Sequence, residues 1–401
     1  MNRSRRKALI IGCGVAGPVV ALFLHQAGIE TEIYEARAMS TEYGGSFLNM
    51  ACNGLDVLKT LRLEGLVSQE GSPIPRMILW NGEGKRLGEV HNGARAEVGA
   101  PSVVIMRGRL HQVLREEAQR QGIKITFGKK MAGLSTGEQG VIATFVDGTT
   151  AEGSFLVGCD GVHSRTRQSI NPDAPTPHYT GLISTGGFAQ HSSFPPTPDT
   201  QHFIFGKRAF FGYHIGSRGE LYWFVNFPQK AAPSRGDGDM IVSDAWQERM
   251  LDLFRGDLPL ISEMIRATES PIISYPIYDI FTQPIWQKGP VVLVGDAIHA
   301  VSPSVGQGAS LAMEDAIVLA KCLRDIPDHA LAFATYERLR RARVEHMVQY
   351  ARSLGQAKVM TNPIQVGFRD MLMPFFLKRF ANPAALDWGY SYHVEWDEPV
   401  A

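Results

Sequence analysis

The distribution of apolar residues predicts an α/β protein that opens with a βαβ unit. Residues 7–11 form a β-rich apolar run, which is typical of a strand buried on both faces of a parallel sheet. Residues 15–27 have helical spacing and end at Gly28, a common C-terminal stop. A second apolar strand follows at 29–35. Strand, helix and strand therefore follow one another directly.

Further along the chain, helical and β-rich patterns alternate. Helical spacing predicts helices at 53–63, 107–122, 243–254 and 308–356, with a helical tail from Pro363. Other segments predict strands at 123–127, 141–146, 154–159 and about 270–280, with an Asp147-Gly148 turn between the second and third. Prolines and an Asn-Gly turn indicate antiparallel strands within 73–104, and an aromatic-rich meander is predicted at 201–205, 209–215 and 220–227.

This alternation predicts two domains and a tail. The α/β domain comprises residues 1–72, 102–177 and 283–355, the β-rich domain comprises 73–101 and 178–282, and the helical tail comprises 356–401. Within the tail, residues 371–377 are apolar and flanked by charged residues. We expect this segment to pack on the protein itself, with a membrane interface or a subunit contact as the alternatives.

Charge and cysteine content narrow the class of protein. Forty basic residues balance forty acidic ones, which argues against an electrostatic nucleic-acid binder. The four cysteines are scattered without CxxC spacing, which favours a reducing cytoplasm over a disulfide framework or a zinc site. Arg5-Arg6 resembles a twin-arginine signal, but cleavage after the apolar run that follows would destroy the motif described next. No run approaches the ~20 apolar residues of a membrane-spanning helix.

The first strand leads into Gly12-x-Gly14-x-x-Gly17, placed between a strand and a helix as a dinucleotide fingerprint requires. Gly12 permits the tight turn, Gly14 lets the backbone approach a pyrophosphate, and Gly17 allows close packing of helix and strand. Glu35 ends the second strand, where a carboxylate would bind ribose hydroxyls. The alternative is a glycine turn without a ligand.

A second glycine motif follows the strand at 291–294. Asp296 lies at the strand end, where it is suited to a ribityl or ribose hydroxyl, and Gly306-Gln307-Gly308 opens a long apolar helix. The N-terminus of this helix could stabilise negative charge on a reduced flavin ring. A plain crossover without a ligand is the alternative. Two motifs with different spacings suggest one long cofactor bound at both ends.

A third cluster, residues 158–167, contains Asp160-Gly161 followed by Ser164 and Arg167. Alone, it fits an ordinary polar loop equally well. The three clusters, in this order, resemble those of the FAD-dependent aromatic hydroxylases, the single-component flavoprotein monooxygenases of the para-hydroxybenzoate hydroxylase type. The resemblance covers residues 7–355. The matching positions in the Gly-Asp motif are Gly295, Asp296, His299, Pro303, Gly306 and Gly308.

The resemblance implies a Rossmann-like FAD-binding domain of the glutathione-reductase type, with an inserted β-sheet substrate domain and C-terminal helices. The cofactor-binding residues would be Gly12, Gly14, Ala16, Gly17, Glu35, Arg37, Gly45, Arg107, Asp160, Asp296, Gly306 and Gly308. Asp160 would serve FAD and the nicotinamide cofactor together, partly by holding neighbouring backbone. Arg37 and Arg109 fit plain surface charges equally well, and His163 and His299 are better explained as loop-structuring residues than as catalysts.

In that family, NAD(P)H reduces the flavin, and its C4a-hydroperoxide with O2 delivers oxygen to the substrate, so the cofactor carries the chemistry. The sequence accordingly shows no obvious catalytic triad or metal cluster, and we assign no catalytic residue. A second GxGxxG motif and a redox-active cysteine pair, which a disulfide-reductase-type flavoenzyme would carry, are also missing. We expect FAD, with NADH or NADPH as co-substrate, in a monomer or homodimer.

The substrate side is less specific. The aromatic meander would cover the flavin, with Phe211 and Tyr213 in one register and Phe210 and His214 in the other, each equally suited to plain sheet core. Pro303 would lie near the flavin ring, and Phe211, Tyr213 and Pro303 are the candidate substrate-binding residues. The expected substrate is an aromatic or polycyclic small molecule. Alternatives are tetracycline-type inactivation or antibiotic tailoring, a Baeyer–Villiger or epoxidation outcome, a non-oxygenating flavin reductase, and a flavin-binding redox regulator.

Overall fold

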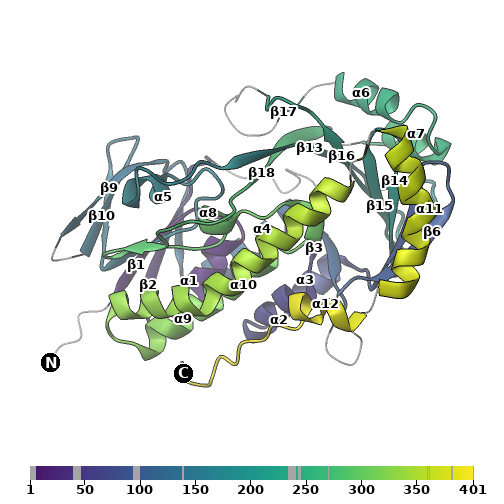
Figure 1. Ribbon diagram of the computed structural model, residues 1–401. Helices are drawn as coiled ribbons and strands as arrows, with labels where there is room; N and C mark the ends of the chain where they lie inside the picture. The colour runs from purple at the N-terminus through teal and green to yellow at the C-terminus, as the bar shows by residue number, and fades with distance from the viewer. Residues whose placement is uncertain are drawn as a thin grey trace.

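Two large sheets organise the molecule, and helices cover them (Figure 1). The computed structural model describes residues 6–38, 47–93, 100–137, 140–233, 241–242, 245–269, 271–358, 360, 362–380 and 383–400.

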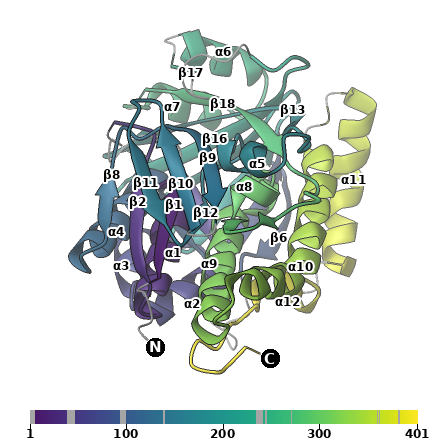
Figure 2. The same ribbon diagram turned by 90° about the vertical axis from the view of Figure 1, so that its left-hand side faces the viewer.

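The first sheet has six strands within the described residues, and its centre is the opening βαβ unit (Figure 2). In spatial order its strands are β19 (Gln287–Lys288), β20 (Val291–Leu293), β12 (Phe155–Gly158), β1 (Lys7–Ile11), β2 (Glu30–Tyr34) and β8 (Lys124–Thr126). β1 pairs in parallel with β12 and β2, and α1 (Ala16–Gln26) connects β1 to β2. The predicted strand–helix–strand opening is therefore confirmed, with a strand buried on both sides as its apolar run requires.

Two long helices pack beside this sheet. α9 (Gly308–Asp325) contacts α1, and α10 (His329–Lys358) lies against α9. The predicted helical stretch over 308–356 is confirmed, and it is divided into two helices because the chain leaves the helical conformation at Ile326, whose φ and ψ are −108° and 111°. This break turns α10 back onto α9.

Two small sheets complete the first half of the molecule. One contains β11 (Thr150–Gly153), β10 (Gly140–Phe145) and β9 (Met131–Gly137), and the other contains β3 (Phe47–Met50), β7 (Val103–Met106) and β4 (Ser72–Pro73). The Asp147-Gly148 turn joins β10 to β11, and not to the strand at 154–159 as predicted. That later strand, β12, belongs to the six-stranded sheet, because its four residues are all buried beside β1.

The second large sheet has eight strands, counted over the same described residues. In spatial order they are β17 (Ile241–Val242), β18 (Ile273–Asp279), β13 (His178–Ala189), β16 (Leu221–Pro228), β15 (Phe210–Ile215), β14 (Thr200–Phe205), β5 (Arg76–Asn81) and β6 (Arg86–His91). The predicted meander is confirmed as β14, β15 and β16. β13 is not among the predicted strands, because its run of Gly, Ser and Thr resembles a loop. The domain boundaries remain a prediction.

Short helices surround these sheets. They are α2 (Cys52–Thr60), α3 (Glu64–Glu70), α4 (Arg107–Arg120), α5 (Arg165–Ile170), α6 (Ala245–Leu253), α7 (Pro259–Arg266), α8 (Asp296–His299), the 3₁₀ turn η1 (Pro303–Val305) and α12 (Pro383–Tyr390). The sequence analysis also missed α7, which begins with a proline at its first position.

The tail helix α11 (Pro363–Phe380) lies along β6 (Figure 1). Leu377 packs against Gly88, and the guanidinium of Arg369 donates a hydrogen bond of 3.1 Å to the carbonyl oxygen of Phe205. The tail therefore packs on the body of the protein, as expected from the sequence. Its outer side exposes apolar residues that include Phe368 and Phe375.

Candidate functional site

The first glycine turn has the geometry that the sequence predicts. Gly12 has a φ of +105°, and a Cβ there would lie 2.4 Å from the carbonyl oxygen of Cys159. A Cβ at Gly17 would lie 2.0 Å from the carbonyl oxygen of Gly12, so helix and strand touch at this point. A Cβ at Gly14, by contrast, would meet no described protein atom within 4 Å. Gly12 and Gly17 are therefore required by packing, whereas Gly14 borders open space.

Glu35 lies directly beside this turn. Its carboxylate accepts hydrogen bonds from the backbone N–H of Cys13 at 2.8 Å and of Arg37 at 3.0 Å. The carboxylate is thus held at the carboxyl end of β2, next to the N-terminus of α1. α1 begins without a side-chain cap, so the N–H groups of its first turn face the same region. This arrangement suits a ribose beside a diphosphate.

Basic side chains gather around the same region, more of them than the sequence analysis identified. Burial and, to a smaller extent, the positive charges of Arg107, Arg115 and Arg37 together lower the pKa of His111 to about 3. Arg107, His111 and Arg115 are spaced four residues apart along α4, so they share one helix face. That spacing could have revealed His111 and Arg115. Three positive charges near the glycine turn favour a dianionic diphosphate.

The second glycine turn lies next to the first. Gly295 has a φ of +64°, and a Cβ there would lie 3.5 Å from the Cβ of Ala16, at the start of α1. Half-buried Asp296 follows at the N-terminus of α8. The two motifs, 279 residues apart between Ala16 and Gly295, therefore meet in space.

The second glycine motif, residues 295–308, is called the flavin-end motif below because the resemblance assigns it to the flavin end of FAD, and it continues into α9. Gly306 adopts the left-handed conformation, with φ and ψ of 64° and 25°, and closes η1. Pro303 begins η1, and α9 starts at Gly308 without a side-chain cap on Gln307. The first turn of α9 therefore has backbone N–H groups suited to partial or full negative charge.

A buried charge network supports this motif. Asp315, on α9, accepts hydrogen bonds from the backbone N–H of Gly295 at 3.0 Å, from Nε2 of His299, and from Nε of Arg340 at 2.8 Å. Burial raises the pKa of Asp315, but the charges of His299 and Arg340 outweigh it and bring the pKa to about 2. His299 therefore structures the loop, as expected. Asp315 and Arg340 were missed, because their partners are far away in sequence.

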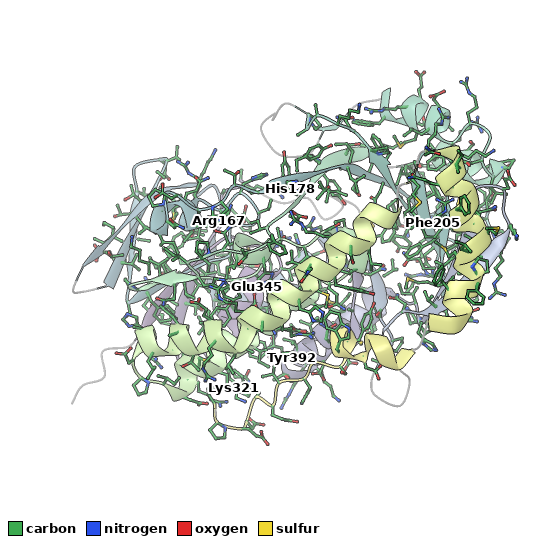
Figure 3. The ribbon with its side chains drawn as sticks, viewed as in Figure 1. Arg167, His178, Phe205, Lys321, Glu345 and Tyr392 are labelled. Carbon is green, nitrogen blue, oxygen red and sulfur yellow. The ribbon has the colours of Figure 1, made fainter. Side chains whose placement is uncertain are left out.

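Asp160 holds the third cluster together, and Arg167 joins it to the second glycine motif. Asp160 accepts hydrogen bonds from the backbone N–H of Thr166 at 2.9 Å and from the hydroxyl of Ser164, so it holds the start of α5. The buried guanidinium of Arg167 donates to the carbonyl oxygens of Ala297 at 2.7 Å and of Val162 at 2.8 Å (Arg167 is labelled in Figure 3). Asp160 therefore acts here by holding backbone, as the resemblance implied.

The flavin-end motif also contacts β3 and α2. Asn53 donates hydrogen bonds to Gln307 at 3.0 Å and to Glu314 at 2.6 Å, all three side chains being buried. A Cβ at Gly306 would lie 3.4 Å from the Cβ of Asn49 on β3. The turn before α9 is therefore held against β3.

The face of the meander that lies toward β3 differs from the one first proposed. Phe47 of β3 packs edge-on against Tyr222 and Phe224 of β16. Since side chains alternate along a strand and Phe224 pairs opposite Gly212, the same face carries Phe210 and His214 of β15. This is the second of the two registers considered from the sequence.

Phe211 and Tyr213 lie on the opposite face. Phe211 is fully buried between Trp223 and Phe254, the last of which belongs to the α6–α7 region, and Tyr213 stacks on His202 at 4.8 Å. This placement argues against their assignment to the substrate pocket and makes them sheet core. Sequence alternation could not distinguish the registers, because all six residues of β15 are buried.

Other expectations have simple outcomes. Gly45 lies outside the described residues. Arg109 pairs with Glu70 through two hydrogen bonds of 2.7 Å, which fits the surface-charge interpretation. Among the described residues, no group of three or more His, Cys, Asp or Glu is placed to hold a metal ion. In the same part of the chain, no helix is both long and apolar enough to cross a membrane.

Comparisons with known proteins agree with this geometry. The family described as "FAD binding domain" matches residues 5–351. The chain belongs to this family of flavoprotein monooxygenases. It is 31% identical to the aurachin C monooxygenase/isomerase of Stigmatella aurantiaca, covering 91% of this chain and 93% of that one. It is 28% identical to the 6-hydroxynicotinate 3-monooxygenase of Pseudomonas fluorescens, covering 84% and 88%.

Solved structures give the same result. HpxO of Klebsiella pneumoniae, complexed with FAD and uric acid, matches with a TM-score of 0.83 and 25% identity over 95% of this chain and 96% of that one. The predicted family, fold class and cofactor are thereby confirmed. The protein is an FAD-dependent monooxygenase of the NAD(P)H-dependent class.

Proposed function

We propose that this protein uses NAD(P)H and O2 to hydroxylate a planar aromatic or N-heteroaromatic small molecule. The observation that carries the proposal is the meeting of the two glycine turns at Ala16 and Gly295. A Cβ at Gly295 would also lie 2.9 Å from the Cβ of Ala312 on α9, so α1 and α9, which both begin without side-chain caps, meet at this turn. An aromatic sheet face lies beside β3, which contacts the turn at Gly306.

The residues present fit FAD. Gly14 borders open space, where the diphosphate can approach the N-terminus of α1, and Glu35 is held where it can accept from ribose hydroxyls. Arg107 and Arg37 supply positive charge for the phosphates. Asp296 would bind the ribityl chain, and the turn from Gly306 to Gly308 would hold the ring end.

Bound FAD supplies the redox chemistry, accepting electrons from NAD(P)H and activating O2. The protein's own part is to bind, orient and exclude water. The N-terminus of α9 stabilises negative charge at the ring end, since its N–H groups and dipole are fixed before the reaction. Phe47, Tyr222 and Phe224 supply an apolar wall, which keeps the site dry and favours a flat aromatic ligand.

The substrate class draws on the relatives as well. The names of two relatives, 6-hydroxynicotinate 3-monooxygenase and FAD-dependent urate hydroxylase, specify small N-heterocycles, and another specifies 3-amino-4-hydroxybenzoate. Each is a planar ring with polar substituents. The aromatic face of β14–β16 suits such rings.

An isotope experiment tests the proposal. The purified protein, loaded with FAD, would be screened against aromatic acids, hydroxypyridines, quinolones and tetracyclines for stimulation of NAD(P)H oxidation. With ¹⁸O2, we expect one labelled oxygen atom in the product. Stimulated NAD(P)H oxidation without label in any product would indicate a reductase, and absence of turnover with every compound would indicate a binding protein. Either outcome would overturn the proposal.

A further inference from the structure

Two side-chain amides form a bridge between the flavin-end motif and the meander. Nδ2 of Asn49, on β3, donates a hydrogen bond of 2.9 Å to Oε1 of Gln201, on β14. Gln201 is fully buried. The bond joins residues 152 positions apart in the chain, so the fold alone brings them together.

The bridge leaves one donor and one acceptor unused. Nε2 of Gln201 and Oδ1 of Asn49 are both buried and have no hydrogen-bond partner in the described part of the chain. Buried amide groups are nearly always paired, because an unpaired one loses its bonds to water without replacement. Exchanging the oxygen and nitrogen of both amides swaps their roles but still leaves one donor and one acceptor. This pairing capacity does not depend on which amide donates.

The amide pair lies between the flavin-end motif and the aromatic wall of the proposed substrate site. Asn49 contacts the turn at Gly306, since a Cβ added to Gly306 would lie 3.4 Å from the Cβ of Asn49. Two residues earlier on the same strand face, Phe47 packs against Tyr222 and Phe224. The unpaired amide groups therefore adjoin the apolar wall on one side and the ring end of the cofactor site on the other.

We propose that Asn49 and Gln201 bind the ring-amide edge of a planar heterocyclic lactam, an N–H beside a C=O within the ring. The N–H would donate to the free amide oxygen, and the C=O would accept from the free amide N–H. A carboxylate or phenolate offers acceptors only and leaves one protein group unpaired. A neutral phenol must serve both groups through a single oxygen. The inference rests on the proposed function, because it names the substrate class of that site.

Matched ligands test the preference. The FAD-loaded protein would be titrated with 6-hydroxynicotinate against 4-hydroxybenzoate, and with 2-quinolone against 2-naphthol, following the flavin absorbance spectrum. In each pair a ring nitrogen replaces a ring C–H, so the lactam carries N–H beside C=O where the carbocycle carries C–H beside C–OH. We expect the lactam of at least one pair to bind about 10-fold more tightly or better, as two hydrogen bonds against one predict. Equal affinities, tighter binding of the carbocycles, or no spectral change with any ligand would overturn the inference.

Variants of Gln201, on β14, test whether its side-chain amide causes the preference for lactams. Gln201→Met removes the donor, and Gln201→Glu replaces it with an acceptor while keeping an oxygen for Asn49. Both should lower the lactam affinity about 10-fold and leave the carbocycle affinity within about 3-fold. His202→Gln is the matched control, because His202 faces the other way and stacks on Tyr213; it should keep the preference.

The melting temperature and the amount of bound FAD show whether each variant is folded. If Gln201→Met does not fold, the affinities of Gln201→Glu decide the test. A preference that persists in the folded Gln201 variants would overturn the inference and leave the amide pair as a tether between β3 and β14. A wild-type protein that does not retain FAD would overturn the proposed function instead. A protein that retains FAD and oxygenates some substrate without any preference for lactams would overturn this inference alone.

Discussion

Asp315 offers the sharpest test of how the cofactor site is built. It is fully buried on α9 and accepts hydrogen bonds from Gly295, His299 and Arg340. Asp315→Asn keeps the shape of the side chain but removes its charge. The amide also has one oxygen in place of two, so it can no longer accept from all three donors.

The magnitude follows from burial. Removing one partner of a buried ion pair typically costs about 3–5 kcal/mol, because the other charge stays buried without compensation. Arg340 keeps a second ion pair, with Glu314 at 2.7 Å, so we expect the lower end, about 3 kcal/mol. The backbone N–H of Gly295 also loses its acceptor in one amide orientation. FAD affinity should therefore fall together with stability.

Urea unfolding, followed by tryptophan fluorescence, measures the first effect, and FAD titration measures the second. Glu345→Gln is the control, because Glu345 pairs with Arg341 at the surface, where a pair contributes at most about 1 kcal/mol. If Asp315→Asn loses no more stability than Glu345→Gln, the buried network does not stabilise the fold as argued.

The pH dependence provides a second check on Asp315. Its folded pKa of about 2 is lower than the ordinary value of 3.8, so its contribution is full above pH 3.8 and is lost as the pH falls toward 2. The stability difference between wild type and Asp315→Asn should therefore shrink on acidification through this range. A difference that is constant down to pH 2 would contradict the assigned charge.

Three further substitutions test the residues proposed to surround the diphosphate of FAD. Gly17→Ala places a Cβ 2.0 Å from the carbonyl oxygen of Gly12, so it should destabilise the protein by about 1–3 kcal/mol in urea unfolding and prevent FAD retention. The Cβ added by Gly14→Ala would meet no described protein atom within 4 Å, so the free energy of unfolding should change by less than about 0.5 kcal/mol. FAD should bind at least about 10-fold more weakly, because the Cβ would occupy the space proposed for the diphosphate. Unchanged FAD affinity would refute the placement of the diphosphate beside Gly14. The pKa of His111 in the folded protein is about 3, against an ordinary value of 6.5, so wild-type stability should fall as the pH drops from 6.5 toward 3. His111→Gln should reduce this dependence of stability on pH by about 1.4 kcal/mol per pH unit. An unchanged dependence would contradict the burial of His111 among the three arginines.

Local signals in the sequence were sufficient for the opening of the fold. The apolar run at β1, the glycines after it and the acid at Glu35 each act through near neighbours in the chain, and the structure places all of them as predicted. The same holds for the turn into α9 at Gly306 and Gly308. Backbone conformation and strand burial are local properties, so sequence reveals them.

Tertiary contacts decided the rest of the site. Asp315 is an ordinary helix residue in the sequence, and only the return of α10 brings Arg340 to it. Asn49 and Gln201 carry no motif, and their bridge exists only because β3 meets β14.

The sequence by itself predicted the two glycine turns and the helices that follow them, because the positive φ angles of Gly12, Gly295 and Gly306 are local conformations that favour glycine. Only the tertiary structure decided which face of the meander lies toward β3. β15 is buried on both faces, so its side chains show no alternation between apolar and polar that could identify the inner one. The packing of Phe47 on Tyr222 and Phe224, and of Phe254 on Phe211, separates the two faces.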